Sequence, residues 1–332
     1  MPISSNASYT TTMDAFSAHW WQSNAVLGPN PLTIRLPDNT TMTLAQFDAL
    51  STSLGGQQLE VQSRLIDVQI TRGGIDLMKA ALLAKINTFN SLLDADYHGT
   101  CFHAARPNVP GLGEGPERFT GPLRDAAKLW QMMNDGPAPA GVSLPVTLAD
   151  GTTQESFDAE IIALQAQYQE ARTKGVLVTL ARGERDLMQV RAYAAMKIYR
   201  QAVPVKLAQH PALVETLPAL TPLPGHTPAP VLASATLLES NEAKVVHTAS
   251  ADPDLKAYQL RGNVGDRYDD GDAVVIATHE PGEPLEFVTN FGLTQPGARI
   301  ALKVFVILTT GNECGSAALV VQRPAQGRRL AA

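Results

Sequence analysis

The chain has 332 residues, of which 44% are hydrophobic and 17% charged, and its net charge at pH 7 is −6. This hydrophobic content is ample for globular cores and excludes an intrinsically disordered protein. The negative balance gives no electrostatic footprint for nucleic acid, and the two cysteines, Cys101 and Cys314, form neither a disulfide framework nor a zinc pattern. The length predicts two or three domains.

The N-terminal residues MPISSNASYTTTMDAF contain no basic start and no apolar run, so we expect no Sec signal peptide. No stretch reaches about 18 consecutive apolar residues, so we expect no membrane span. These patterns favour a cytoplasmic protein, and export by a route other than Sec stays open.

The first 43 residues predict a short helix followed by a small β-arm. Thr12 is a candidate cap for a helix over residues 13–26, which would end at Gly28. Residues 32–36 alternate as a strand does, and residues 40–42 would return as its partner after a turn at Pro37-Asp38-Asn39.

A long helix is predicted over residues 44–94. Thr43 and Gln46 form a capping box at its start. Apolar residues then recur every seven positions without a change of phase, at Phe47, Leu54, Val61, Val68, Ile75, Leu82 and Phe89. The alternative is a helical hairpin that turns at Gly73-Gly74, since each glycine costs roughly 1 kcal/mol inside a helix. We favour the continuous helix because a turn would reset the phase.

The same order of elements follows once more. A Pro- and Gly-rich crossing at residues 97–122 precedes a short helix at 123–135, an arm at 144–153 and a second long helix at 154–203 that Pro204 would end. Arg185 interrupts the apolar seam of this helix where the first one has Ile75.

Residues 47–93 align with residues 157–203 at a constant shift of 110 positions. The alignment needs no gap and gives 13 identities in 47 positions, including Arg72-Gly73-x-x-Asp76-Leu77-Met78 on Arg182-Gly183-x-x-Asp186-Leu187-Met188. Unrelated sequence would give roughly three identities, so we infer a tandem duplication. We expect repeats at residues 1–110 and 111–210, packed as one helical bundle with a local two-fold.

Residues 211–228 are Pro-rich and predict a stiff linker. From residue 229 the pattern changes to short alternating runs between turns, with seven candidate strands at 230–237, 242–249, 256–262, 272–278, 285–290, 299–308 and 316–322. This predicts a small β-sandwich over residues 229–325, followed by a tail at 326–332.

The C-terminal region resembles a fibronectin type III domain. Residues 249–261 (ASADPDLKAYQLR) are similar to that family's passage from the second to the third strand, and residues 304–316 are similar to its sixth strand and last hairpin. His247 stands where the family usually has Trp, and Phe305 stands where Tyr is common. The resemblance implies a non-catalytic adhesive or spacing module, and a fold alone does not choose the partner. The fold class is therefore multidomain α plus β: a duplicated long-helix bundle with β-arms, then a seven-stranded sandwich.

Two repeated pairs, Arg72/Asp76 and Arg182/Asp186, have the i, i+4 spacing of an intrahelical ion pair worth about 0.3–0.5 kcal/mol. The alternative is that the two pairs meet across the two-fold of the bundle. We favour the intrahelical pairs.

No constellation in the sequence points to catalysis or to a cofactor. The densest carboxylate cluster, Asp266, Asp269, Asp270 and Asp272, could supply oxygens for calcium, but it lacks the EF-hand spacing and favours a solvated loop. Cys101-x-His103 has no third partner nearby, so we expect a buried structural cysteine. The run Gly111-Leu112-Gly113-Glu114-Gly115 does not follow a strand as a nucleotide-binding loop does, and His247 is expected to be a core histidine.

The sequence favours a non-enzymatic structural subunit that associates with itself into a filament, tube or lattice. The first alternative is a monomeric or dimeric adaptor whose sandwich binds a protein or glycan. The second is an enzyme whose site forms at the junction of the bundle and the sandwich.

Overall fold

The computed structural model describes residues 2–324 and contains six helices in that range. Contacts divide the chain into two compact units: residues up to Asp67 together with those from Leu177 onward, and residues Val68–Val176. The helices are α1 Ser8–Leu27, α2 Leu44–Asp96, α3 Cys101–Ala104, α4 Pro116–Asp135, α5 Gln154–Lys206 and α6 Pro211–Glu215.

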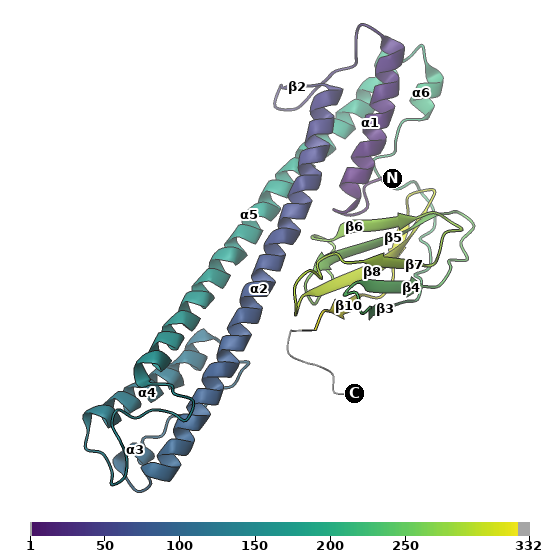
Figure 1. Ribbon diagram of the computed structural model, residues 1–332. Coiled ribbons are helices and arrows are strands. Elements are labelled where there is room, and N and C mark those ends of the chain that lie inside the picture. Colours follow the sequence, from purple (N-terminus) through teal and green to yellow (C-terminus); the bar gives the residue numbers. More distant parts are fainter. Residues whose placement is uncertain (1, 325–332) are drawn as a thin grey trace. The chain divides into compact units, whose positions relative to one another are not determined.

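Helices α2 and α5 are the dominant elements, with 53 residues each. Each is a single unbroken helix that passes through its glycines, so the hairpin at Gly73-Gly74 is wrong (Figure 1). Both helices begin in one unit and end in the other. The packing units therefore differ from the two sequence repeats, and the domain boundaries drawn from the repeats stay predictions.

The two units have helical cores built from equivalent aromatic residues. In the first unit, Trp20 of α1 packs on Phe47 at 5.7 Å and on Tyr199 at 4.7 Å between ring centroids. In the second unit, Trp130 of α4 packs on Phe157 at 5.9 Å and on Phe89 at 5.1 Å. The three residues of one core are each 110 positions from those of the other. Each core thus combines the start of one long helix with the end of the other.

The same tryptophans hold the β-arms by matching hydrogen bonds. Trp20 Nε1 donates to the Leu32 carbonyl at 3.0 Å, and Trp130 Nε1 donates to the Val146 carbonyl at 3.1 Å. In the first arm the strands are β1 Ile34–Arg35 and β2 Thr41–Met42. The second arm is reduced to one bridge between Thr147 and Thr153.

Several predicted helix ends need correction. Helix α1 begins at Ser8, and Thr12 lies inside it, where its hydroxyl donates to the Ser8 carbonyl at 2.7 Å instead of capping the helix. Helix α4 begins at Pro116, since proline fits the first turn of a helix, where its missing N–H has no intrahelical partner. Helix α5 continues past Pro204 to Lys206, because this proline lies in the final turn and removes only one hydrogen bond.

Part of the Pro-rich stretch after α5 packs on the helical core of the first unit. Leu220 is buried there, and α6 is fixed by His19, whose two ring nitrogens lie 2.8 Å from Tyr199 Oη and from the Leu213 carbonyl. Burial raises the pKa of Tyr199 to about 12, against a smaller lowering by its hydrogen bond to Ser23. Residues 211–220 are thus an ordered part of the core, although they were expected to be a linker.

The C-terminal region is a β-sandwich of two antiparallel sheets (Figure 1). One sheet has the order β3-β4-β7, and the other has the order β10-β8-β5-β6 with β9 paired to β8. The strands are β3 Ala233–Leu237, β4 Ala243–His247, β5 Leu255–Val264, β6 Val274–His279, β7 Glu286–Thr289, β8 Arg299–Leu308, β9 Glu313–Gly315 and β10 Leu319–Gln322. The seven predicted strands are present, and β9 is additional.

The two positions that depart from the fibronectin pattern are both packed. His247 is buried, as predicted, and its ring lies 4.5 Å from that of Tyr258 and 5.6 Å from that of Phe287. The Arg261 guanidinium lies 4.2 Å above the Phe305 ring. Arg261 also forms an ion pair with Glu313 at 2.6 Å and donates to the Ser5 hydroxyl at 3.0 Å. Arg261 thus ties this sheet to the N-terminal segment at Ser5.

Candidate interaction site on the long helices

The aligned stretches of α2 and α5 bury equivalent positions. In residues 66–84 the buried positions are 68, 71, 75, 79 and 82, and in residues 176–194 they are 178, 181, 185, 189 and 192. Each buried position of the second set lies 110 residues after its equivalent in the first set. Equivalent burial explains why apolar residues recur at positions such as Val68 and Val178, because the same packing selects the same side chains.

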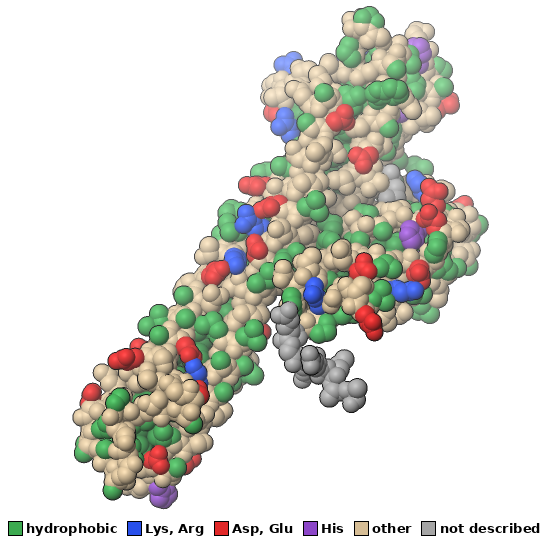
Figure 2. Space-filling view, in the orientation of Figure 1, with side chains coloured by type: hydrophobic (Ala, Val, Ile, Leu, Met, Phe, Trp, Pro, Cys, Tyr) green, Lys and Arg blue, Asp and Glu red, His purple; other side chains and the backbone are tan. Residues whose placement is uncertain are grey.

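Other identities between the two stretches lie on the outside, where the core cannot explain them. Leu77 and Leu187 are equivalent, and both side chains are 72% exposed. Ile70 is 50% exposed, and its equivalent Leu180 is 58% exposed. Figure 2 shows hydrophobic side chains exposed among charged ones on the helices and on the sandwich. Scattered exposed leucines need no explanation, but the same exposed leucine in two equivalent places does.

Gly73 and Gly183 are a second exposed identity. A Cβ added at either glycine would meet nothing within 4 Å. Glycine inside a helix costs roughly 1 kcal/mol relative to alanine. The packing of the described residues therefore does not require glycine at these places, although it recurs at both. We name the row Val176, Leu180, Gly183, Leu187, Val190 and Ala194 the α5 stripe, and the equivalent row Ile66, Ile70, Gly73, Leu77, Ala80 and Ala84 the α2 stripe.

The repeated Arg/Asp pairs do not form the expected intrahelical ion pairs. Arg182 binds Asp272 of the sandwich through two nitrogens, with its Nε 2.9 Å from Asp272 Oδ1, and Asp186 accepts hydrogen bonds from Arg185 at 2.9 and 3.0 Å. This contact with Asp272 is the largest cause that raises the pKa of Arg182. In residues 2–324, Arg72 and Asp76 form no ion pair with each other either. Arg182 thus serves the junction with the sandwich, and Asp186 is paired with Arg185.

Arg185 interrupts the apolar seam because it is a partner of the same carboxylate. Its side chain is 6% exposed, and Nη1 lies 3.1 Å from Asp272 Oδ1 and 2.7 Å from the Gly271 carbonyl. Gln62 completes the junction, because its side chain donates to the Asp272 carbonyl at 2.6 Å and accepts from the Val264 N–H at 3.0 Å. A buried charge at this position is tolerated because it is paired and hydrogen-bonded.

In the acidic loop before β6, the Asp272 carboxylate is bound by Arg182 and Arg185. Asp269 accepts from the Gly271 N–H at 2.8 Å, and Asp266 lies 3.8 Å from Arg299, while Asp270 is exposed. Within residues 2–324 no group of three or more His, Cys, Asp or Glu side chains could hold a metal ion. The carboxylates that would serve calcium are thus dispersed among other partners.

Cys101 is exposed, so the expectation of a buried cysteine is wrong. It is the first residue of α3, a single helical turn capped by Thr100 at the surface. His103 Nε2 lies 3.0 Å from Asp94 Oδ1, and Asp94 also accepts from Arg106. The histidine is therefore engaged with a carboxylate and is not paired with the thiol as a base would be.

The Gly-rich run at residues 111–115 is held by a buried lysine that the sequence did not single out. Lys79 Nζ donates to the Leu112 carbonyl at 2.5 Å and to the Glu114 carbonyl at 2.9 Å, and it lies 4.7 Å from the centre of the Phe119 ring. A loop whose carbonyls face a cation cannot present its N–H groups to a phosphate in the same place. The structure thus gives this run a packing role.

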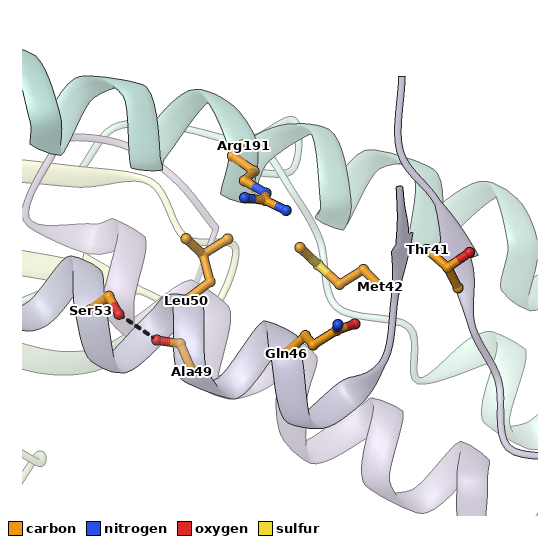
Figure 3. A pocket seen from close by; sticks show the side chains of 7 residues that line it. All are labelled: Thr41, Met42, Gln46, Ala49, Leu50, Ser53 and Arg191. Carbon is orange, nitrogen blue, oxygen red and sulfur yellow. Dashed lines mark hydrogen bonds between the residues drawn. The ribbon is translucent and has the colours of Figure 1, made fainter. Parts of the chain in front are cut away.

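Two depressions lie beside α2 in the first unit. One has a volume of about 220 Å³ and is lined by Arg191 of α5, which extends toward Leu50 and Met42 (Figure 3). The other, of about 400 Å³, contains Asp14 and Asp48, and burial followed by the Asp48 charge raises the pKa of Asp14. Neither has the aromatic lining and enclosed shape of a ligand site.

Comparison with known proteins finds likeness only to solved structures, over about a third of the chain. No family model and no curated protein matches. A Fn3-like protein from Clostridium thermocellum is 22% identical, with 31% of this chain and 100% of that one covered and a TM-score of 0.24. The fn3 domain of human contactin 1 is 16% identical, with 33% and 86% covered and a TM-score of 0.25. A pectate lyase from Erwinia chrysanthemi is 14% identical, and the match spans 28% of each chain with a TM-score of 0.24.

Among the described residues, no helix is both long enough and apolar enough to cross a bilayer. The sequence could have indicated the two stripes, because the identities Gly73/Gly183 and Leu77/Leu187 fall outside the heptad positions that predict the core.

Proposed function

We propose that this chain is a non-catalytic structural subunit that associates with further copies of itself, through its helical body and its β-sandwich, into a filament, tube or lattice. The observation that carries the proposal is the identity of Leu77 with Leu187 and of Gly73 with Gly183, all on the outside of the long helices. A residue that recurs at an equivalent exposed place has a role outside the packing of its own chain.

Two equivalent surfaces make each chain bivalent. A bivalent subunit that binds copies of itself extends from both surfaces, so its assemblies grow with concentration unless the geometry closes them into a ring. Sandwich contacts would add lateral strength, since the outer face of the β3-β4-β7 sheet presents Val246 and Val288, both about half exposed. No cofactor enters this proposal.

An adaptor or adhesion role is the second candidate. Its support is the same pair of exposed valines on one sheet face, beside the ion pair of Lys244 with Glu286 at 2.6 Å. A small apolar patch with a polar rim is a common feature of a protein- or glycan-binding surface. In this case the helices would space the sandwich and would not bind copies of the chain.

Sedimentation velocity and negative-stain electron microscopy of the full chain over a wide concentration range test the proposal. We expect species that grow with concentration and ordered filaments, tubes or sheets. Uniform monomers or dimers at every concentration would refute self-assembly and favour the adaptor role.

A further inference from the structure

We propose that the α5 stripe binds the α5 stripe of a second copy, with Leu187 of each chain seated over Gly183 of the other, and that the α2 stripe pairs in the same way through Leu77 and Gly73. This inference rests on the proposed function and specifies the contact by which copies of the chain meet.

The α5 stripe has the shape of a knob beside a notch. At about 100° per residue, its six positions fall within an arc of about 80° on one face of the helix. Leu180 lies one turn before Gly183 and Leu187 one turn after it, and both leucines are more than half exposed. Nothing fills the space above Gly183. The glycine is therefore the floor of a notch between two apolar side chains.

This shape is complementary to itself. When two such helices pair antiparallel about a two-fold axis, a residue faces the one equally distant on the other side of the axis. With the axis midway between Gly183 and Leu187, each leucine faces the glycine of the other chain, and Leu180 faces Val190. The same operation on the α2 stripe sets Leu77 over Gly73 and Ile70 over Ala80.

Charge favours a second copy as the occupant. The chain carries a net charge of −6, so two copies repel one another except where a surface is uncharged. All twelve positions of the two stripes are uncharged: Val176, Leu180, Gly183, Leu187, Val190, Ala194, Ile66, Ile70, Gly73, Leu77, Ala80 and Ala84. A surface evolved for an oppositely charged partner would carry charges to match it.

The area of one stripe predicts a weak contact. A leucine-sized side chain offers roughly 100 Å² of apolar surface, so one stripe contributes on the order of 400 Å². A stable interface buries about 800 Å² on each partner. One stripe alone therefore makes a weak contact, and copies of the chain should associate through it only at high protein concentration.

Single and double substitutions in the full chain test this pairing. Leu187→Glu removes the α5 contact and leaves the α2 contact, so we expect growth to stop at discrete dimers in sedimentation velocity. Leu77→Glu should do the same, and the double variant should stay monomeric at concentrations at least about tenfold above those at which the natural sequence assembles. Leu223→Glu is the control, since Leu223 is 54% exposed and lies outside both long helices, between α6 and β3, and it should assemble normally.

A second variant separates assembly from folding. Gly183→Leu fills the notch with a residue that favours helix, so the melting temperature should stay the same or rise while growth again stops at dimers. Arrays that persist in Leu187→Glu and Gly183→Leu would overturn the inference. Monomers from either single variant would overturn the pairing of like with like. If the natural sequence does not associate at all, the proposed function itself fails.

Discussion

The substitution Asp272→Asn tests whether the buried ion pairs hold the sandwich on the helices. Asp272 is 5% exposed, and its carboxylate accepts hydrogen bonds from both Arg182 and Arg185. The change keeps the shape of the side chain and one acceptor oxygen, but it removes the charge that both arginines neutralise.

The expected loss in the free energy of unfolding is about 2–3 kcal/mol. Removing one partner from a buried pair costs about 3–5 kcal/mol, because the remaining charge is left uncompensated. Arg185, at 6% exposed, bears most of this cost, but it keeps its ion pair with Asp186 at 2.9 Å. Arg182 is 39% exposed and solvent screens its share, so the total falls below the upper limit.

Urea denaturation and thermal melting of the full chain measure this loss. A unit of this size shifts by about 2–4 °C per kcal/mol, so we expect the first unit to melt about 5–10 °C lower. Asp270→Asn, an exposed carboxylate in the same loop, is the control and should change stability by less than about 0.5 kcal/mol. The double variant with Arg185→Ile, which restores the residue type of Ile75, should lose less than the sum of the single variants. A variant Asp272→Asn that unfolds like the natural sequence would refute the role of the junction.

Three further predictions concern single side chains. Burial and the nearby charge of His279 lower the pKa of His247, although its hydrogen bond to the Thr248 carbonyl acts in the opposite direction. The unfolded chain therefore takes up the proton at a higher pH than the folded chain, and stability falls as pH drops below about 6.5. His247→Phe should flatten this part of the stability–pH curve, and an unchanged slope would contradict the assignment. Gly262→Ala places a Cβ 2.6 Å from Leu302 Cδ2 and 3.0 Å from the Ala301 carbonyl oxygen, so the free energy of unfolding should fall by about 1–3 kcal/mol. Gly56→Ala is the control: its Cβ meets nothing within 4 Å, and it should stabilise the chain. Lys79→Met removes the donor that binds the Leu112 and Glu114 carbonyls. The free energy of unfolding should fall by about 2 kcal/mol, and proteolysis at residues 111–115 should become faster. Equal cleavage rates would show that the lysine does not hold the loop.

Helix α2 was predictable because its apolar residues keep one phase across four glycines. Exposed helical glycines weaken a helix without shifting its phase, so the heptad pattern outweighed them. The strands of the sandwich were predictable for a similar reason, because alternation and turns are local signals. Strand β9 was missed because three residues after a turn carry too little pattern.

The partners of the helices were not predictable, because periodicity shows which face is buried and not what covers it. Trp20 and Tyr199 touch in the core, but nothing in the sequence indicates that residues 179 positions apart meet. Arg185 appeared as an interruption of the seam for the same reason. Its partner Asp272 lies 87 residues further along the chain, in the β-sandwich, and only the tertiary structure brings the two charges together.

The sharing of each core between two distant segments has a consequence for the order of folding during synthesis. The core around Trp130 uses residues 75–164, so it can close while the rest of the chain is still being made. The core around Trp20 uses residues 13–54 and 192–220, so residues 13–54 must wait for residues made much later. Contacts of such long range are slow to form and leave apolar surface uncovered meanwhile. The middle of the chain should therefore fold first, and α1 should need protection from premature association until α5 is complete.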